Sequence, residues 1–397
     1  MTPKRIAELT AIYRDGLLKD TVPFWTKHAV DRKYGGFTTY VDADGSLVST
    51  DKAIWVQGRF TWLLARLYNE VEKRPEWLRL SRHGVEFILK HAFDTDGRCF
   101  YSVTRDGRPL RKRRYLFSET FIIIALAEYA LASGDGEIRR KAVELYRRLI
   151  MYYRTPGLLP PKVLPQTRQW KGHSMPMILL ATTQVLRRVD DHPLYKEVVD
   201  QSIREILNDF VDPKRQVLLE TVGPNGEKRY DLPEGRLANP GHAIETAWFL
   251  MEEGRYRNDR KLIEQGAQIT EWSLDLGWDR KFGGISYFVD IEGKPAEPYE
   301  HDMKLWWPHN EAIYGTLLAH HLTGRKSFET WHRRVHDWAY SHFPDRKNGE
   351  WFGYLHRDGT ISSPIKGNMW KGPFHLPRMQ LYCWKLLEEM GRKGGGR

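Results

Sequence analysis

Apolar residues recur every three or four positions along most of the chain, which is the spacing of helices that bury one or more faces. Residues typical of helix ends bound these segments: Pro3, Asp51 and Ser118 at starts, and Gly134, Gly277 and Gly324 at stops. The pattern predicts twelve helices, which span residues 3–20, 51–72, 77–93, 117–133, 136–153, 173–190, 193–210, 241–255, 258–276, 304–323, 325–342 and 372–391.

Short segments between these helices carry alternating apolar residues around an X-Gly pair, the pattern of a tight β-hairpin. The glycines recur at roughly equal intervals, except for one interval of about double length. A degraded copy of the hairpin is expected in that interval, near Pro160–Gln166. The predicted hairpins are Gly36–Gly45, Cys99–Gly107, Val217–Gly226, Ile285–Gly293 and Trp351–Gly359.

The sequence itself repeats at three of these places. Asp31–Gly36 returns as Asp279–Gly284 and, more weakly, as Asp345–Gly349. Together the segments make six units of helix, hairpin and helix, which form either an open solenoid or a closed ring. Terminal capping repeats are not evident, which favours closure. The predicted fold class is therefore all-α, an (α/α)6 barrel with short β-hairpins in the loops at one end.

Composition fits one large globular domain. The chain has 397 residues, 41% of them hydrophobic, which is enough to bury a substantial core. No linker rich in glycine, serine or proline divides it, so we expect a single domain over residues 1–391 and a flexible tail over 392–397. The 15 tryptophans and 19 tyrosines either pack between helices or line a pocket for flat ligand faces, such as those of sugars.

The net charge of +11 raises the question of nucleic acid. Two short basic runs, Arg111–Arg114 and Arg139–Lys141, are the only clusters, and no nucleic-acid motif accompanies them. Cys99 and Cys383 make no metal spacing and no disulfide framework, which suits a reducing cytoplasm. The first twenty residues do not have the pattern of a signal peptide, and no stretch of 18 apolar residues exists. We therefore expect a cytoplasmic protein that binds neither nucleic acid nor membrane.

The repeat makes a geometric prediction about where a site would lie. Each hairpin precedes the even-numbered helix of its unit, so the N-terminal ends of those helices should share one face of the ring. A concave mouth with a few convergent polar groups is the default site. Polar residues recur at these places, and they are Arg59, Glu119, His173, His242, Glu245, Lys304, His309, Glu311, His375 and Arg378.

Two of the histidines stand at equivalent places in the repeat. His242 follows a Pro-Gly turn, with Glu245 one turn later, and His375 lies in a second Gly- and Pro-rich helix start. A histidine transfers protons near neutral pH, and two of them across a pocket suit inversion of a carbon beside a carbonyl. Arg59 is expected either to hold the developing negative charge or to form a salt bridge in the barrel.

Several other kinds of chemistry have no support in the sequence. The phosphate-binding, dinucleotide-binding, zinc-peptidase and nucleophile-elbow motifs are absent from the chain. No cluster of metal ligands is evident either, so no metal site is predicted. Electrostatic help for a reaction is expected to come from side chains.

At these residues the sequence resembles the N-acylglucosamine 2-epimerase family, which also contains cellobiose 2-epimerases, mannose 2-epimerases and aldose–ketose isomerases. The resemblance covers nearly the whole chain. Its most specific segments are Asn239–Glu245 with Trp248, Lys304–Glu311, Gly349–Tyr354, Ile365–Gly367 and Phe374–Arg378, and weaker matches are Phe117–Glu119 and Gln57–Arg59.

The resemblance implies an (α/α)6 barrel in which His242 and His375 are the catalytic pair. It implies ring opening of the sugar, then loss and regain of the C2 proton through an enediol-type intermediate. The resemblance also implies that no cofactor is required, that ATP, where it acts, is an allosteric effector, and that the protein is a homodimer, as is common in the family. The residues expected to bind substrate are Arg59, Glu119, His173, Glu245, Trp248, Trp307, His309, Glu311, Trp370 and Arg378.

The sequence leaves several substrates and two other reaction classes open. The first hypothesis is epimerisation of N-acyl-D-glucosamine to N-acyl-D-mannosamine, although Trp370 before Lys-x-x-x-His is more similar to the cellobiose branch. Cellobiose and mannose 2-epimerases and aldose–ketose isomerases are alternatives. An inverting glycosidase of the same fold would use two carboxylates among Glu119, Glu245 and Glu311. A helical scaffold for a protein partner would need none of these groups.

Overall fold

The computed structural model describes residues 1–112, 115–160, 163–164 and 166–394 of the chain. Three predictions fall partly outside the described residues. They are the basic run at 113–114, the degraded hairpin copy at 161–162 and 165, and the tail at 395–397.

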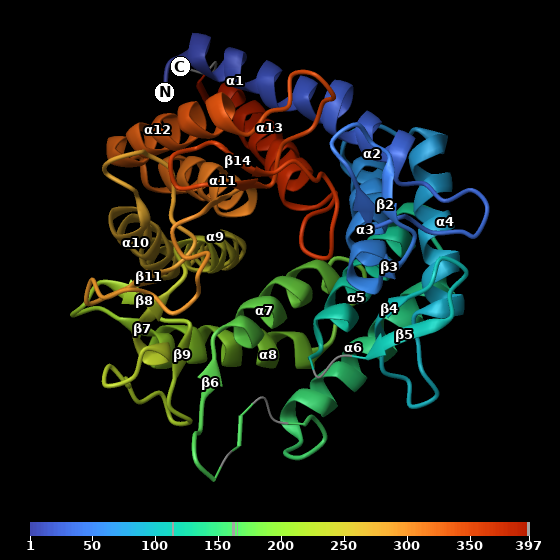
Figure 1. Ribbon diagram of the computed structural model, residues 1–397, viewed down its shortest axis with the longest axis horizontal. Coiled ribbons are helices and arrows are strands. Elements are labelled where there is room, and N and C mark those ends of the chain that lie inside the picture. The colour runs from blue at the N-terminus through green and yellow to red at the C-terminus, as the bar shows by residue number, and fades with distance from the viewer. Residues whose placement is uncertain (113–114, 161–162, 165, 395–397) are drawn as a thin grey trace.

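The helices form two concentric rings, as Figure 1 shows, and the predicted (α/α)6 barrel is confirmed. The inner helices are α3 (Ile54–Glu70), α5 (Phe117–Ser133), α7 (Ser174–Leu186), α9 (Pro240–Arg257), α11 (Trp306–Thr323) and α13 (His375–Gly394). The outer helices are α1 (Pro3–Asp15), η1 (Gly16–Thr21), α2 (Val22–His28), α4 (Pro75–His91), α6 (Gly136–Arg154), α8 (Pro193–Glu205), η2 (Ile206–Phe210), α10 (Arg260–Gly277) and α12 (Lys326–His342). The N-terminal helix α1 packs on α13, which closes the ring.

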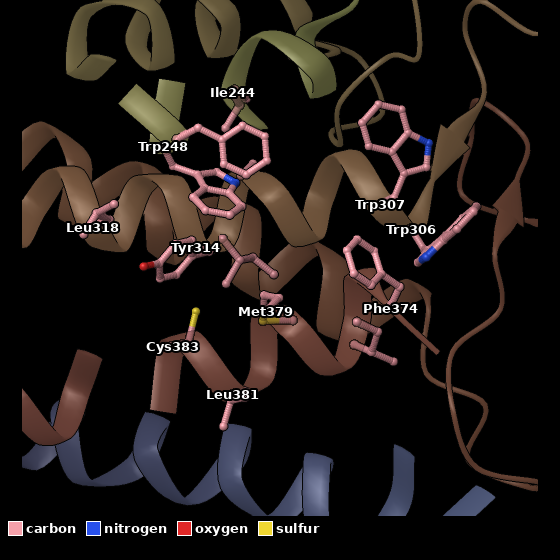
Figure 2. Close-up of a cluster of buried hydrophobic side chains, with 14 of the residues drawn as sticks. Ile244, Trp248, Trp306, Trp307, Tyr314, Leu318, Phe374, Met379, Leu381 and Cys383 are labelled. Carbon is pink, nitrogen blue, oxygen red and sulfur yellow. The ribbon is translucent and has the colours of Figure 1, made fainter. Parts of the chain in front are cut away.

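The two rings differ in how much of each helix is apolar. Inner helices are buried nearly all round, and in α5 every residue from Ser118 to Ala130 is buried. Outer helices such as α10 bury one face and expose the other. Figure 2 shows the inner layer in close-up: Trp248 lies against Tyr314, and Leu381 of α13 points toward α1. No helix in the described part of the chain combines the length and apolarity needed to cross a bilayer.

Helix ends follow the sequence with two corrections. Gly134 and Gly324 cap α5 and α11 in the left-handed conformation, as predicted. The first helix was expected to end at residue 20, but it continues through a π-helical turn as far as His28. Pro23 does not stop it. This proline lies in the first turn of α2, where a backbone N–H has no acceptor within that helix, so the missing N–H of proline costs no hydrogen bond there. Asp51 does not begin a helix, since a short strand precedes α3.

Three predicted hairpins are confirmed, and they are β1 (Tyr40–Val41) with β2 (Leu47–Ser49), β4 (Phe100–Val103) with β5 (Pro109–Lys112), and β13 (Tyr354–Leu355) with β14 (Ile361–Ser363). Two others are wrong as hairpins. The predicted Val217–Gly226 hairpin is split, because β8 (Val217–Leu218) pairs with β7 (Val211–Asp212) and β9 (Thr221–Val222) pairs with β6 (Lys171–Gly172). In the predicted Ile285–Gly293 hairpin, β11 (Val289–Asp290) pairs with β10 (Leu237–Ala238).

The pairing of these strands explains how the fold fixes one end of the barrel. A short strand precedes four of the inner helices, and it pairs with a strand of the next unit. These leading strands are β3 (Lys52–Ala53), β6, β10 and β12 (Lys304–Leu305). Because each ladder ties one unit to its neighbour, the N-terminal ends of the inner helices are held together at the same end of the barrel.

The repeated Asp-Arg-Lys sequence makes the same buried ion pair three times. Each aspartate accepts backbone N–H groups of its own turn and contacts a lysine that is fully buried. The pairs are Asp31–Lys52 at 3.0 Å, Asp279–Lys304 at 3.2 Å and Asp345–Lys366 at 3.0 Å. Lys304, one of the recurring polar residues, is thus a part of the scaffold.

Candidate active site

A cavity of about 1440 Å³ lies within the inner ring. All six inner helices contribute to its wall, and so do the loops at their N-terminal ends. Eight of the residues predicted for the site line it, and they are Arg59, His242, Glu245, Trp248, Trp307, Trp370, His375 and Arg378. The repeat therefore brings together side chains that are far apart in the sequence.

His242 lies in the first turn of α9. Asn239 caps the helix by accepting the backbone N–H of His242, and Pro240 has no N–H of its own to satisfy. The His242 Nδ1 atom lies 3.2 Å and 3.1 Å from the two carboxylate oxygens of Glu220. Burial lowers the pKa of His242, but the carboxylate of Glu220 more than offsets this, so the pKa is raised above its ordinary value.

His375 is the first residue of α13 and has a different environment. Its Nδ1 lies 2.7 Å from Oε1 of Glu311. Burial is the main reason that the pKa of His375 lies well below its ordinary value. Glu245 acts in the opposite direction, and the cations of Arg378 and Arg59 add to the lowering. At neutral pH this imidazole is uncharged and able to accept a proton.

A single indole lies between the two histidines. The ring centre of Trp307 is 5.0 Å from that of His242 and 5.7 Å from that of His375. Both imidazoles also line the same cavity. A ligand that rests on Trp307 is therefore within reach of both imidazoles.

Arg378 joins two buried carboxylates beneath this pair. One Nη2 atom of Arg378 donates to Glu245 and, at 2.7 Å, to Glu311. Glu311 also accepts the indole N–H of Trp248 at 2.8 Å. Burial opposes the charge of Arg378, but Glu311 and Glu245 outweigh it and raise the pKa of the guanidinium. Arg378 therefore keeps its charge and shares it between these two acids.

The same carboxylates bear on two other chemistries. Glu245, Glu311 and His375 each offer one possible metal-ligand atom, and these three atoms lie within 4.8 Å of one another. The guanidinium of Arg378 already serves as the cation for both carboxylates. An inverting glycosidase needs its two carboxyl groups about 6.5–9.5 Å apart. Glu245 and Glu311 lie closer than that and share one arginine, so this pair does not fit an inverting glycosidase.

Arg59 is the second cation that acts on His375. Its guanidinium stacks on three aromatic rings, at 4.1 Å from the centre of Phe121, 4.8 Å from Trp55 and 4.9 Å from Phe374. It also donates to the backbone carbonyl of Trp370 at 3.4 Å. The side chain of Trp370 is 57% exposed at the rim of the cavity. Arg59 thus brings a positive charge to the wall of the site.

Four predicted residues do not line the cavity. Glu119 is buried in an ion pair with Arg98 and accepts the N–H of Cys99. His309 is fixed between the backbone of Leu305 and that of Ile285, and burial lowers its pKa to about 3. His173 and Glu311 lie one layer behind the wall, where they contact Glu220 and His375 respectively.

Glu220 and the aromatic residues of one loop were not predicted from the sequence. Glu220 was hidden because it follows two buried leucines in a strand-like segment, yet an acid in that apolar run is the signal that could have revealed it. Tyr287, Phe288 and Tyr299 belong to the loop before β12 and line the cavity. Nothing in the alternating pattern of that loop shows which of its aromatic side chains turn inward.

The chain is similar to known proteins over most of its length. The family model for N-acylglucosamine 2-epimerase (GlcNAc 2-epimerase) matches residues 35–375. The N-acylglucosamine 2-epimerase of Bos taurus is 35% identical over 94% of this chain and 90% of its own. The cellobiose 2-epimerase of Dictyoglomus turgidum is 25% identical over 92% and 95%. The solved cellobiose 2-epimerase of Bacillus thermoamylovorans superposes with a TM-score of 0.84 at 21% identity, over 96% of this chain and 100% of that one.

Proposed function

The chain belongs to the N-acylglucosamine 2-epimerase family, and from that premise we propose that it interconverts N-acyl-D-glucosamine and N-acyl-D-mannosamine. It is thus an isomerase that acts on carbohydrate. One observation carries the proposal: two imidazoles, at the N-terminal ends of α9 and α13, flank the same indole in one cavity.

We propose that the reaction proceeds on the ring-opened sugar. The neutral imidazole of His375 removes the proton from C2, and the electron pair of the C–H bond moves toward the C1 carbonyl to give an enolate whose C2 carries the acylamino group. The cation of Arg59 stabilises the negative oxygen. The imidazolium of His242 then returns a proton to the opposite face of C2, which inverts that carbon. In the reverse direction the two histidines exchange roles.

The identity of relatives supports an N-acylated hexosamine as the substrate. Relatives named for N-acylglucosamine are 33–35% identical to this chain, whereas those named for cellobiose are 23–25% identical. A second candidate is cellobiose. The exposed indole of Trp370 at the rim and the volume of about 1440 Å³ leave room for a second sugar ring.

We further propose that the enzyme acts as a homodimer in the cytoplasm and needs no cofactor, with ATP as an allosteric effector only. The buried and unpaired thiols of Cys99 and Cys383 support a reducing compartment. The guanidinium of Arg378 between the two acids supports a reaction without a metal ion. The family resemblance supports the dimer and the role of ATP. Gel filtration, and activity with and without a chelator and ATP, would test these points.

The test is exchange of the C2 proton with solvent. The enzyme is incubated in D2O with N-acetylmannosamine, cellobiose or mannose, and proton NMR follows both the C2 signal and the new epimer. We expect exchange and epimerisation of the N-acetylated sugar, and a loss of about 10²–10⁴-fold or more in the His242→Ala and His375→Ala variants. His356→Ala, on an exposed turn, is the control. Absence of exchange with every sugar, or full activity in both cavity variants, would overturn the proposal.

A further inference from the structure

The carboxylate of Glu220 lies between two histidines of different burial. On one side is His242, whose Nδ1 is 3.1 Å from Glu220 Oε2. On the other side is His173, fully buried, whose Nδ1 is 3.8 Å from Glu220 Oε1. The segment between β8 and β9 carries Glu220 and is fixed by a bond from its N–H to the carbonyl of Leu237. The carboxylate is therefore bonded to His242 on one side and lies near the His173 ring on the other, and of these two histidines only His242 lines the cavity.

We propose that Glu220 is the positioning residue of the reaction, which holds the Nδ1 side of His242 so that Nε2 faces the substrate and which favours the protonated form of this imidazole. The inference rests on the proposed function, because it assigns a role to the partner of a proposed acid. Glu220 lies in none of the motifs found in the sequence.

His173 supports the carboxylate without neutralising it. The backbone N–H of His173 donates to the carbonyl of Glu220 at 3.0 Å, and its Nε2 lies 3.0 Å from the hydroxyl of Thr246. With the hydroxyl donating to Nε2, the proton of the neutral ring is on Nδ1, which faces Glu220. Burial lowers the pKa of His173, so this ring brings no positive charge. The full negative charge of Glu220 is thus left for His242.

The charges around the two proposed catalytic histidines differ for this reason. Among the described residues, Glu220 makes ionic contacts with His173 and His242 alone. Glu311, which contacts His375, shares its charge with Arg378. The other ionisable groups that face His242 are Glu245 on its own helix, Glu311 on α11, His375 on α13 and His173 before α7, and Tyr287 of the overlying loop faces Glu220.

This asymmetry sets the order of proton transfers. Before turnover His242 carries the proton and His375 does not. His375 gains a proton from C2, and His242 gives one to C2, so one C–H bond breaks and another forms. The enzyme ends with the proton on His375, which is the state that binds the opposite epimer. Both states carry the same number of protons, so forward and reverse reactions should share one bell-shaped pH profile.

The test is the Glu220→Gln variant, which keeps the shape of the side chain and removes its charge. We expect kcat for C2 exchange to fall by about 10-fold to 10⁴-fold, with a smaller change in KM, because the role of the residue is in proton transfer. The alkaline limb of the pH profile should move to lower pH, since the imidazolium of His242 loses its counter-charge. Nitrogen-15 NMR of the histidine rings reads the same change in tautomer and charge directly.

Matched variants separate this role from a structural one. Glu252→Gln removes a carboxylate from α9 in the same cavity, where it accepts from the Tyr314 hydroxyl and makes no contact with His242. Its alkaline limb should stay in place. Glu220→Asp keeps the charge and should keep the limb near its normal pH even if kcat falls. In a His242→Ala background, Glu220→Gln should add no further loss.

The outcomes distinguish the two proposals. If the unaltered enzyme exchanges no C2 proton, the proposed function fails and Glu220 has no such role. If the unaltered enzyme is active but Glu220→Gln leaves the alkaline limb unmoved, the inference about Glu220 is overturned while the function stands. A further large loss on adding Glu220→Gln to His242→Ala would also overturn it, since Glu220 would then act independently of the imidazole.

Discussion

At the scale of single residues, the site gives two identical side chains opposite properties. His242 and His375 both occupy the first turn of an inner helix, and both direct Nδ1 at a glutamate. The pKa of His242 is raised, because the Glu220 carboxylate outweighs burial, and that of His375 is lowered, because burial there dominates. Repetition of the fold supplies the two positions, and their different surroundings suit one to the proposed role of acid and the other to the proposed role of base.

Arg378 provides a prediction at this scale. Its guanidinium donates to both Glu245 and Glu311, and all three side chains are buried. Replacement by methionine keeps the bulk but leaves two uncompensated carboxylates in the barrel. We expect Arg378→Met to lower the free energy of unfolding by about 3–5 kcal/mol. Urea denaturation measures this, and Arg378→Lys, which keeps the charge, should lose less. A change under about 1 kcal/mol for Arg378→Met would show that these acids do not depend on the arginine.

At the scale of elements, the seam between α1 and α12 carries an unusual polar cluster. The hydroxyl of Tyr13 lies 3.0 Å from Nε2 of His332 and 2.8 Å from Nδ1 of His336. One hydroxyl has one proton to donate, so one imidazole must accept and the other must donate. A second proton on the accepting ring would break the cluster. Because all three side chains are buried, the seam needs neutral histidines.

The seam predicts a dependence of stability on pH. Burial lowers the pKa of His336 to about 3 and that of His332 well below its ordinary value, and Arg5 adds to the lowering. An unfolded histidine has a pKa of about 6.5 and binds a proton at acidic pH that the folded protein does not bind. The free energy of unfolding should therefore fall as pH drops from about 6.5 to about 3, by up to ~1.4 kcal/mol per pH unit for each histidine.

The variant His336→Gln tests that dependence, since glutamine hydrogen-bonds but does not ionise. Urea denaturation at several pH values between 7 and 4 should show a shallower decline for this variant than for the unaltered chain. A substitution of the exposed His356 by glutamine is the control and should leave the slope unchanged. Equal slopes for His336→Gln and the unaltered chain would contradict the account of the seam.

At the scale of elements, the helices could be predicted from the sequence but some of the strand pairs could not. The inner and outer helices were predictable because their apolar spacing is strong and local, and glycine at positions 134 and 324 ended them as expected. The strand partners of β9 and β11 were not, because short strands have little pattern and pair with segments of another unit. A hairpin signal marks a turn better than it marks which strand lies beside it.

The site, too, could be predicted only in part from the sequence. Residues at equivalent places in the repeat, such as His242 and His375, were predicted together and do line one cavity. Glu119 and His309 also stood at those places, but an ion pair with Arg98 and backbone bonds to Leu305 hold them in the scaffold. The direction in which a side chain points depends on such tertiary partners, which spacing along one chain does not contain.

At the scale of the whole molecule, the ring is closed by its two ends. Leu9, Tyr13 and Leu17, along the first outer helix, are fully buried, and α1 packs on α13. Gly391, near the end of α13, lies against the side chain of Ile6. The N-terminal helices are thus a wall of the barrel, and removing them would uncover the apolar back of α13, which carries the proposed base.

The last prediction follows from that closure. A circularly permuted chain, with a short flexible linker from the end of α13 to the start of α1 and new ends between Gly134 and Asp135, should fold and keep C2 exchange near its normal rate. The new ends fall in an exposed turn, and Gly134 and Asp135 would still cap α5 and α6.

A chain lacking residues 1–28 should instead lose both cooperative unfolding and activity, and so should a permuted chain opened inside α9 between Thr246 and Ala247. Thermal unfolding and the deuterium assay measure both properties. Full activity in the truncated chain would mean that the barrel does not depend on being closed.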